Sequence, residues 1–446
     1  MKKTVRNSII ILSAIIVVFF IAFVSYNKLN PTNPADSETN PFTTEGNERN
    51  KIVVLSDIHL GADLAYAECN KNIPSLQKLL KQISVSPNVK ELVIAGDLLD
   101  EWFVPATIDT YSGKDQRDFV QRIAATNKGV IDAFNNIIQD GKILVTYVPG
   151  NHDLTITAEN IDLILPGINQ ARDKEQGLGT YSPADYPKIA IEHGHRYNFF
   201  CAPDPISNQD VAPGTIMPPG YFFTRIAALH VLQKYPPPGD KMRVVTPNTS
   251  GNTSQSSLFS YWKLWEWAIN NLPIKNKLDE KIIVTNVAGF AKTYAVNDLL
   301  PYQLTSGGKL DVNLFKGIQD TWNQRQILNR VAVNIPVDQA IAKASSAEET
   351  DNQATTQYFM NPNSDKRIVV FGHTHVAKIS SSNNYSGQKS IYANSGTWID
   401  NNPKLTTMNF IVITPQNTNA SSQTNVKLYN FEGEVVTKMA EDSLRY

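Results

Sequence analysis

The sequence predicts a layered α/β fold with an inserted helical cap and an N-terminal membrane helix. Three observations lead to this fold class. Strand patterns alternate with helix patterns in the first part of the chain, polar residues follow the strands, and the middle of the chain is helical where it is periodic. Alternating strands and helices are typical of a sheet with helices packed on it, and ligands bind where such strands end.

The N-terminal segment, residues 1–26, predicts a membrane anchor. Ser8 to Ser25 contains no charged residue, and Lys2, Lys3 and Arg6 precede it. As a helix this stretch would span roughly 27 Å, close to the ~30 Å hydrocarbon core of a bilayer. The basic residues favour a cytosolic N-terminus, with the rest of the chain on the exported, periplasmic or extracellular, side. Secretion after cleavage of a signal peptide is the alternative.

Composition excludes several classes of protein. The chain has 41 basic and 42 acidic residues, so nothing in its charge calls for a nucleic-acid partner. It has 2 cysteines, Cys69 and Cys201, which are too few for a Cys-rich zinc site or a disulfide scaffold. Whether these two cysteines pair with each other stays open, because sequence gives no distance between them.

The rest of the chain divides into a tether, a core in two parts and an insertion. Residues 27–50 are polar and rich in Asn, Pro and Thr, which is typical of a flexible tether. Residues 51–200 and 366–446 carry the strand patterns of the core, whereas residues 201–365 predict the helical cap. Helices are expected at Ile73 to Ser84, Arg117 to Gly141, Pro219 to Tyr235, Ser257 to Leu272 and Leu314 to Val333.

Histidines gather at the ends of the predicted strands together with Asp and Asn. Six of the 7 histidines lie there. The clusters are Asp57 and His59 in SDIHLG, Asp97 and Asp100 in AGDLLDEW, Asn151 and His152 in PGNHD, His193 and His195 in EHGHR, and His373 and His375 in FGHTH. Imidazole, carboxylate and amide ligands without thiolate suit zinc, iron, manganese or nickel. The set is too large for one ion, and paired metals about 3.5–4 Å apart are typical of phosphate-ester hydrolysis.

The five motifs DIH, GDLLD, GNHD, HGH and GHTH, in this order, resemble those of the calcineurin-like metallophosphoesterase superfamily. The resemblance covers Lys51 to Tyr197 and Arg367 to about Asp400, and implies a layered β-sandwich core flanked by helices. It also implies a pair of divalent metal ions, Mn, Fe, Zn or Ni. One ion would be held by Asp57, His59, Asp97 and His375, and the other by Asp97, Asn151, His193 and His373.

Catalytic roles follow from the same resemblance. His152 resembles the family histidine that protonates the leaving oxygen, with Asp100 as the carboxylate that orients it, and a metal-bridging hydroxide is the implied nucleophile. His195 is either a group near the metals or the phosphate, or a polar loop residue. Trp102 either walls the site or belongs to the hydrophobic core.

Departures from the family pattern narrow the subclass. Protein phosphatases of the family read GDxVDRG, whereas this chain has Glu101 and Trp102 after Asp100. Purple acid phosphatases have Tyr at the position of Asp100. The segment GDLLDEW is most similar to UDP-2,3-diacylglucosamine pyrophosphatases, although these have Arg where His152 stands and lack the anchor.

The expected function is hydrolysis of a phosphomonoester, phosphodiester or pyrophosphate by a membrane-anchored enzyme. Its substrate could be lipid-linked or a nucleotide. The alternative is a catalytically inactive relative that serves as a binding or scaffold protein at the membrane surface.

Overall fold

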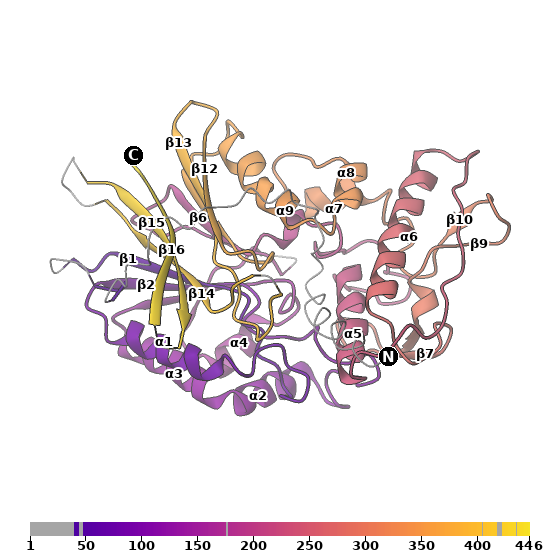
Figure 1. Ribbon diagram of the computed structural model, residues 1–446, viewed down its shortest axis with the longest axis horizontal. Helices are drawn as coiled ribbons and strands as arrows, with labels where there is room; N and C mark the ends of the chain where they lie inside the picture. The colour runs from indigo at the N-terminus through magenta and orange to yellow at the C-terminus, as the bar shows by residue number, and fades with distance from the viewer. Residues whose placement is uncertain (1–39, 44–47, 175–176, 404, 417–421, 434) are drawn as a thin grey trace, which may run out of the picture. The chain divides into compact units, whose positions relative to one another are not determined.

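The computed structural model describes residues 40–43, 48–174, 177–403, 405–416, 422–433 and 435–446. The chain divides into two compact units (Figure 1). The core unit contains the described residues of Ile21–Asp100, Val120–His195 and Ala347–Tyr446, and the described residues of the insert unit are Glu101–Phe119 and Arg196–Ser346. The expected anchor, and the tether except for residues 40–43 and 48–50, lie outside the described residues. Within the described ranges, no helix combines the length and apolar character needed to cross a bilayer.

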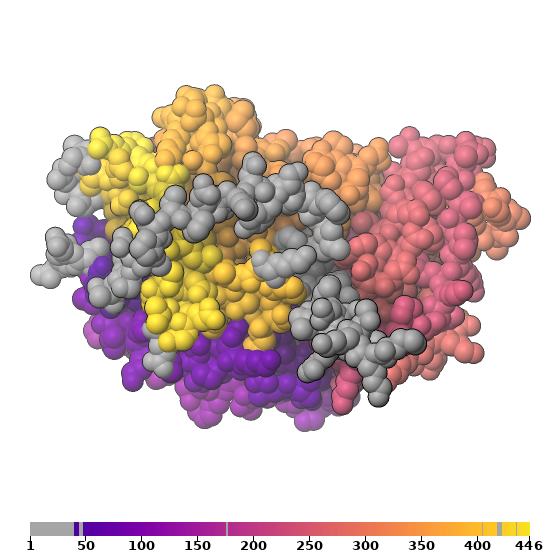
Figure 2. All heavy atoms as spheres, in the orientation of Figure 1, coloured from indigo at the N-terminus to yellow at the C-terminus, as the bar shows by residue number. Residues whose placement is uncertain are grey.

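The first sheet of the core unit has seven strands, and β1, β2, β3 and β4 run parallel to one another in it. The strands, in spatial order, are β16 (Val435–Leu444), β15 (Thr424–Glu432), β14 (Asn409–Thr414), β1 (Lys51–Leu55), β2 (Val89–Ala95), β3 (Leu144–Val148) and β4 (Asn169–Gln170). The antiparallel pairing of β14 with β1 places the C-terminal strands beside the first strand of the unit (Figure 1). In Figure 2 the yellow C-terminal residues accordingly lie against the indigo residues of the same unit.

The second sheet of the core unit has five strands. Their order is β12 (Lys378–Asn383), β13 (Lys389–Asn394), β11 (Ile368–Phe371), β6 (Ile189–Glu192) and β5 (Thr180–Tyr181). Strand β11 pairs in parallel with both β6 and β13. Strands that are far apart in the sequence therefore end side by side at the same edge.

The hydrophobic core lies between the two sheets. One cluster of buried side chains joins Ile52 and Val93 of the first sheet to Ile191, Val370 and Ile391 of the second, so the unit is a β-sandwich. Every residue of β1 is buried, which is expected when both faces of a strand are covered. The helices of the core unit are α1 (Ile73–Ser84), α3 (Lys128–Asp140), α4 (Ala158–Ile164), α9 (Ala347–Ala354) and the π-helical turn η3 (Thr355–Phe359).

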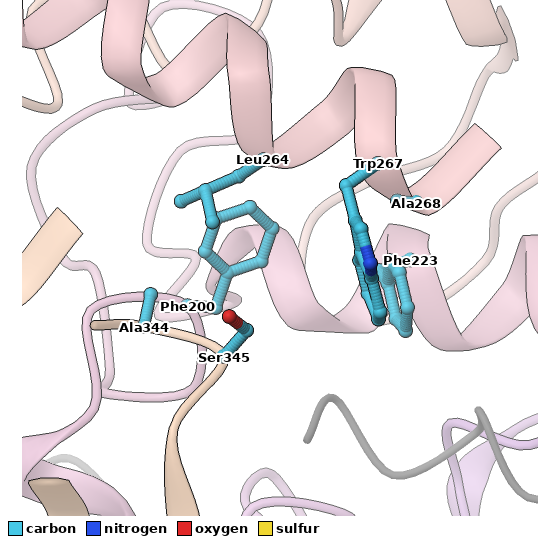
Figure 3. A pocket seen from close by; sticks show the side chains of 7 residues that line it. All are labelled: Phe200, Phe223, Leu264, Trp267, Ala268, Ala344 and Ser345. Atoms are coloured by element: carbon cyan, nitrogen blue, oxygen red, sulfur yellow. The ribbon is translucent and has the colours of Figure 1, made fainter. Parts of the chain in front are cut away.

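The insert unit is built from helices and two small sheets. Its elements are α5 (Pro219–Leu232), α6 (Thr253–Asn271), β7 (Lys281–Val284), β8 (Thr293–Ala295), η2 (Val296–Asp298), β9 (Tyr302–Gln303), β10 (Leu310–Asp311), α7 (Trp322–Leu328) and α8 (Val337–Ala342). Aromatic side chains form much of its interior; Trp265, for example, packs against Phe200 and Phe223. A small apolar hollow between α5 and α6 is lined by Phe200, Phe223, Leu264, Trp267, Ala268, Ala344 and Ser345 (Figure 3).

Two expected helices differ from the observed ones. The pattern over Arg117 to Gly141 divides into α2 (Gln116–Thr126) and α3, because Asn127 is not helical and its amide donates to the carbonyls of Gly61 and Ile123. Over Leu314 to Val333 only α7 is α-helical, since Phe315 and Gly317 have φ angles of 61° and 69°. The structure also assigns residues 347–365, which the sequence placed in the cap, to the core unit.

Candidate metal centre

The candidate ligands lie on loops that leave the carboxyl ends of parallel strands. Strand β1 leads into Asp57 and His59, and β2 leads into Asp97. The two loops are joined because the amides of Ile58 and His59 both donate to the carbonyl of Asp97 at 2.9 Å. The other candidates follow strands β3, β6 and β11 in the same way. They are Asn151, His152, His193, His373 and His375.

Backbone strain is concentrated in these loops. Among the described residues, twelve other than glycine have a positive φ angle, and five of them are candidate ligands. These are Asp57 (53°), His59 (54°), Asp97 (52°), His373 (66°) and His375 (57°). Each such residue costs of order 1–3 kcal/mol and is retained only where the surrounding structure holds it. The sequence therefore keeps these side chains at one point at the expense of local backbone stability.

Three glycines allow the loops to approach the ligands closely. A Cβ atom at Gly96 would overlap the ring of His193, and one at Gly150 would overlap the carboxylate of Asp97. A Cβ atom at Gly372 would overlap the carboxylate of Asp57. The glycines of the AGD, PGN and FGH segments are thus needed for space as well as for turns.

A first group of candidate ligands consists of Asp57, His59 and His375. The Nε2 atom of His375 lies 3.0 Å from Oδ1 of Asp57 and 3.3 Å from Nε2 of His59. All three side chains are buried. Two imidazole nitrogens and a carboxylate oxygen facing one point form the kind of site that binds a divalent metal ion.

A second group consists of Asp57, Asp97 and His193. The Nε2 atom of His193 lies 3.1 Å from Oδ2 of Asp97 and 3.0 Å from Oδ1 of Asn151. The other ring nitrogen, Nδ1, donates to the carbonyl of Ala95 at 2.8 Å. This bond fixes the ring so that Nε2 faces the cluster, as is usual for a histidine that binds a metal.

Asp97, a member of the second group, also faces His59 of the first, and His373 lies beside the second group. Oδ2 of Asp97 is 3.6 Å from Nε2 of His59 and 3.1 Å from Nε2 of His193. The rings of His373 and His193 are 5.1 Å apart, and that of His195, which is also buried, is 5.3 Å from His193. A carboxylate in the position of Asp97 can bridge two ions.

The ionisation of the clustered side chains favours the binding of cations. Burial raises the pKa of Asp97, but the nearby histidines, His193 first, outweigh burial and hold it well below its usual range. Burial lowers the pKa of His373 and of His375, which favours the neutral imidazole that metals bind. Nδ1 of His375 has no hydrogen-bond partner among the described residues. The donors therefore fit a pair of divalent ions.

Asp100 connects one ligand to the candidate acid. Its Oδ1 lies 2.8 Å from Nδ1 of His152, and its Oδ2 lies 3.0 Å from Nδ1 of His59. Burial lowers the pKa of His152, but the carboxylates of Asp100 and Asp97 outweigh burial and the net shift is upward. An imidazole whose pKa is raised in this way can act as a general acid.

Trp102 is placed differently from the other candidates. It belongs to the insert unit, where it is buried and its ring lies 6.3 Å from that of Tyr221. Trp102 therefore belongs to the buried interior of the insert unit.

Several residues of the site were missed by reasoning from the sequence. Glu68 places Oε2 at 3.3 Å from Nδ1 of His59, although no motif contains it. Asp153 accepts hydrogen bonds from the amides of Leu98 and Gly150, which ties two ligand loops together. Its position in the GNHD motif was a signal that could have found it. Asn394, to which the sequence assigned no role, donates to the carbonyl of Gly372 at 2.7 Å.

Comparison with known families agrees with this geometry. Residues 50–217 match the family model of the calcineurin-like phosphoesterases. This part of the chain is therefore similar to the calcineurin-like phosphoesterases. This confirms the resemblance drawn from the motifs, four of which fall within the match. By this similarity the chain is a metal-dependent hydrolase of phosphoric esters, a phosphoesterase, with a centre of two divalent metal ions.

The match ends before the FGHTH motif, but the fold of the phosphoesterase brings that motif to the same cluster through β11. No curated protein matches the chain. The similarity to UDP-2,3-diacylglucosamine pyrophosphatases therefore stays a prediction.

Proposed function

We propose that this phosphoesterase uses His152 as the acid that protonates the leaving oxygen, with Asp100 as its orienting carboxylate. The observation that carries this proposal is the single carboxylate of Asp100, which contacts Nδ1 of His152 at 2.8 Å and Nδ1 of His59 at 3.0 Å. The acid is thereby fixed relative to a candidate metal ligand. The backbone amide of His152 also donates to Oδ1 of Asp97 at 2.8 Å, which fixes the position of its main chain.

The proposed ligands are Asp57, His59, Asp97 and His375 for one ion, and Asp97, Asn151, His193 and His373 for the other. Bound metal ions would supply an activated water and stabilise negative charge on the phosphoryl group. The residues of the chain then have distinct tasks. Asp97 would offer ligand atoms to both ions, the bond from His193 to Ala95 keeps that ring oriented, and His152 would donate a proton to the departing oxygen.

The experiment compares esters that need acid assistance with esters that do not. His152→Ala should slow hydrolysis of an alkyl phosphate about 10²–10⁴-fold. The same substitution should slow an activated nitrophenyl ester much less, because nitrophenolate leaves without a proton. His230→Asn is a matched control, since His230 is a buried histidine of the insert unit that contacts the carbonyl of Pro273. Equal slowing of both esters by His152→Ala would remove the acid role.

The same assay separates an enzyme from the inactive binding protein. All of the proposed ligands are present and lie close together, which favours turnover. Manganese should stimulate hydrolysis by the full chain across a panel of monoesters, diesters, nucleotides and lipid pyrophosphates. Absence of metal-stimulated turnover on every ester would favour the binding protein.

We further propose that residues 1–26 anchor the enzyme in a membrane, with the phosphoesterase on the exported side. The uncharged run from Ser8 to Ser25 and the basic residues before it support this proposal. Expression of the full chain should place it in the membrane fraction after an alkaline wash, and protease added outside should digest it. Release of a shortened chain into the medium would indicate signal cleavage instead.

A further inference from the structure

A short segment of the core unit, α9 and the turn η3, contacts the loops of two proposed metal ligands. The sequence had placed this segment in the cap, and it lies outside the residues that match the family model. It contributes two side chains, Asp351 and Tyr358, toward β6, β11 and the loop after β11.

Asp351 of α9 is buried, and four groups converge on its carboxylate. Oδ1 accepts from the hydroxyl of Thr374 at 3.1 Å, from the hydroxyl of Tyr392 at 2.5 Å and from the amide of Asn394 at 3.3 Å. Oδ2 pairs with Nζ of Lys378 at 2.5 Å. Both oxygens are therefore engaged by the protein, so Asp351 acts on the site through its neighbours.

Thr374 links Asp351 to the loop of two proposed metal ligands. It lies between His373 and His375, whose φ angles of 66° and 57° are strained. A loop with two such residues needs an external contact to keep its shape. The hydroxyl of Thr374 donates to Asp351, and the amide of Asn394 contacts both that hydroxyl, at 3.0 Å, and the carbonyl of Gly372, at 2.7 Å.

Tyr358 of η3 makes the second contact. Its hydroxyl donates to Oε1 of Glu192 at 2.8 Å, and Glu192 is the residue directly before His193. Its ring also packs at 6.4 Å from Phe371, the last residue of β11. The same short segment thus touches the chain next to His193 and next to the loop of His373.

We propose that Asp351 and Tyr358 are positioning residues that hold His193 and His373 in place for the second metal ion. The inference rests on the ligand roles of the proposed function. It predicts that loss of these contacts weakens retention of one ion more than the other, because the loop of His193 and the loop of His373 meet at one side of the centre.

The test measures metal content and not only activity. The full chain should retain two ions after dialysis, whereas Asp351→Ala should retain about one, since loss of a partner behind a ligand costs roughly 10–100-fold in metal affinity. With manganese, the electron paramagnetic resonance signal of a coupled pair should give way to that of an isolated ion. Asp351→Asn, which keeps an acceptor for Thr374, should bind the second ion with intermediate affinity.

Two milder variants and one control make the test decisive. Thr374→Val and Tyr358→Phe each remove one hydroxyl. Each should weaken the binding of the second ion several-fold without unfolding the chain. Glu349→Gln changes a carboxylate on the same helix that accepts from Gln353, and it should retain both ions. If Asp351→Ala fails to fold, Thr374→Val decides the question.

Failure of this inference can be distinguished from failure of the proposed function. A parent chain that binds two ions and hydrolyses esters, with Asp351→Ala and Thr374→Val binding both ions as tightly as the parent, overturns the inference alone. A parent chain that never binds two ions overturns the ligand assignment on which the inference rests.

Discussion

The buried charged side chains of the two units have different kinds of partner. In the insert unit, Arg225 and Arg325 are fully buried, and each guanidinium donates to several backbone carbonyls. Arg325, for example, donates to the carbonyls of Ala202 at 2.7 Å and Phe199 at 3.2 Å. In the core unit, the carboxylates of Asp57 and Asp97 are equally buried but face the same imidazoles.

This difference distinguishes charged groups that hold the fold together from charged groups that form a binding site. A buried guanidinium that donates mainly to backbone carbonyls fixes the path of the chain. Like charges that converge on one point are costly unless a cation joins them. The arrangement in the core unit is therefore explained by metal binding, whereas that in the insert unit is explained by packing alone.

The largest effect is expected at the carboxylate of Asp97, which lies near both His59 and His193. Asp97→Asn removes the charge between His59 and His193, so we expect loss of metal and a fall in kcat/KM of ~10³-fold or more, or about 4 kcal/mol. Elemental analysis and steady-state kinetics measure this. Asp204→Asn, a buried acid of the insert unit that accepts from the amides of Ile206 and Ser207, should keep its metal. Equal metal loss in both variants would contradict the comparison.

A smaller effect, on stability and not on chemistry, is expected in the insert unit. Arg325→Met leaves carbonyls of the 199–203 segment without their donor and Asp204 without its cation, so we expect about 3–5 kcal/mol of destabilisation. Urea unfolding followed by aromatic fluorescence measures it. The folded fraction should retain its metal. Metal loss at unchanged stability would show that the insert unit supports the centre directly.

The strands and their terminal ligands could be predicted because the signal is local. A buried apolar run followed by Asp, Asn or His, as in β1 with Asp57 or β11 with His373, needs no knowledge of distant residues. The sandwich was predicted only by the family resemblance, since no local pattern shows that β11 pairs with β6.

The supporting residues could not be predicted, because their roles depend on contacts across the chain. Asp351 is separated by 41 residues from its partner Tyr392, and Glu68 contacts His59 from an irregular loop. Helix ends at Asn127 and near Phe315 were missed for the same reason, since tertiary contacts and backbone conformation overrode a continuous helical pattern.

Two buried histidines, His193 in the core unit and His230 in the insert unit, test the difference between the units on a single type of side chain. His193 and His230 each place Nδ1 against a backbone carbonyl, that of Ala95 at 2.8 Å and that of Pro273 at 2.5 Å. For His193, burial lowers the pKa, but Asp97 and Asp57 outweigh it and raise the pKa to about 9. For His230, burial dominates and lowers the pKa below its usual value. In the metal-free protein at neutral pH, His193 should be charged and His230 neutral.

Metal affinity should therefore depend on pH through His193. Below its pKa of about 9 the metal must displace a proton from this ring, so affinity rises with pH, by up to tenfold a unit, and this contribution levels off above about 9. Calorimetric titration with zinc in buffers of different ionisation enthalpy measures the protons released. Nuclear magnetic resonance of the histidine rings should show the proton lost from His193, with no response from His230. Zinc binding without proton release at neutral pH would show that the carboxylates do not hold His193 in its charged form, and that the two histidines differ less than their surroundings imply.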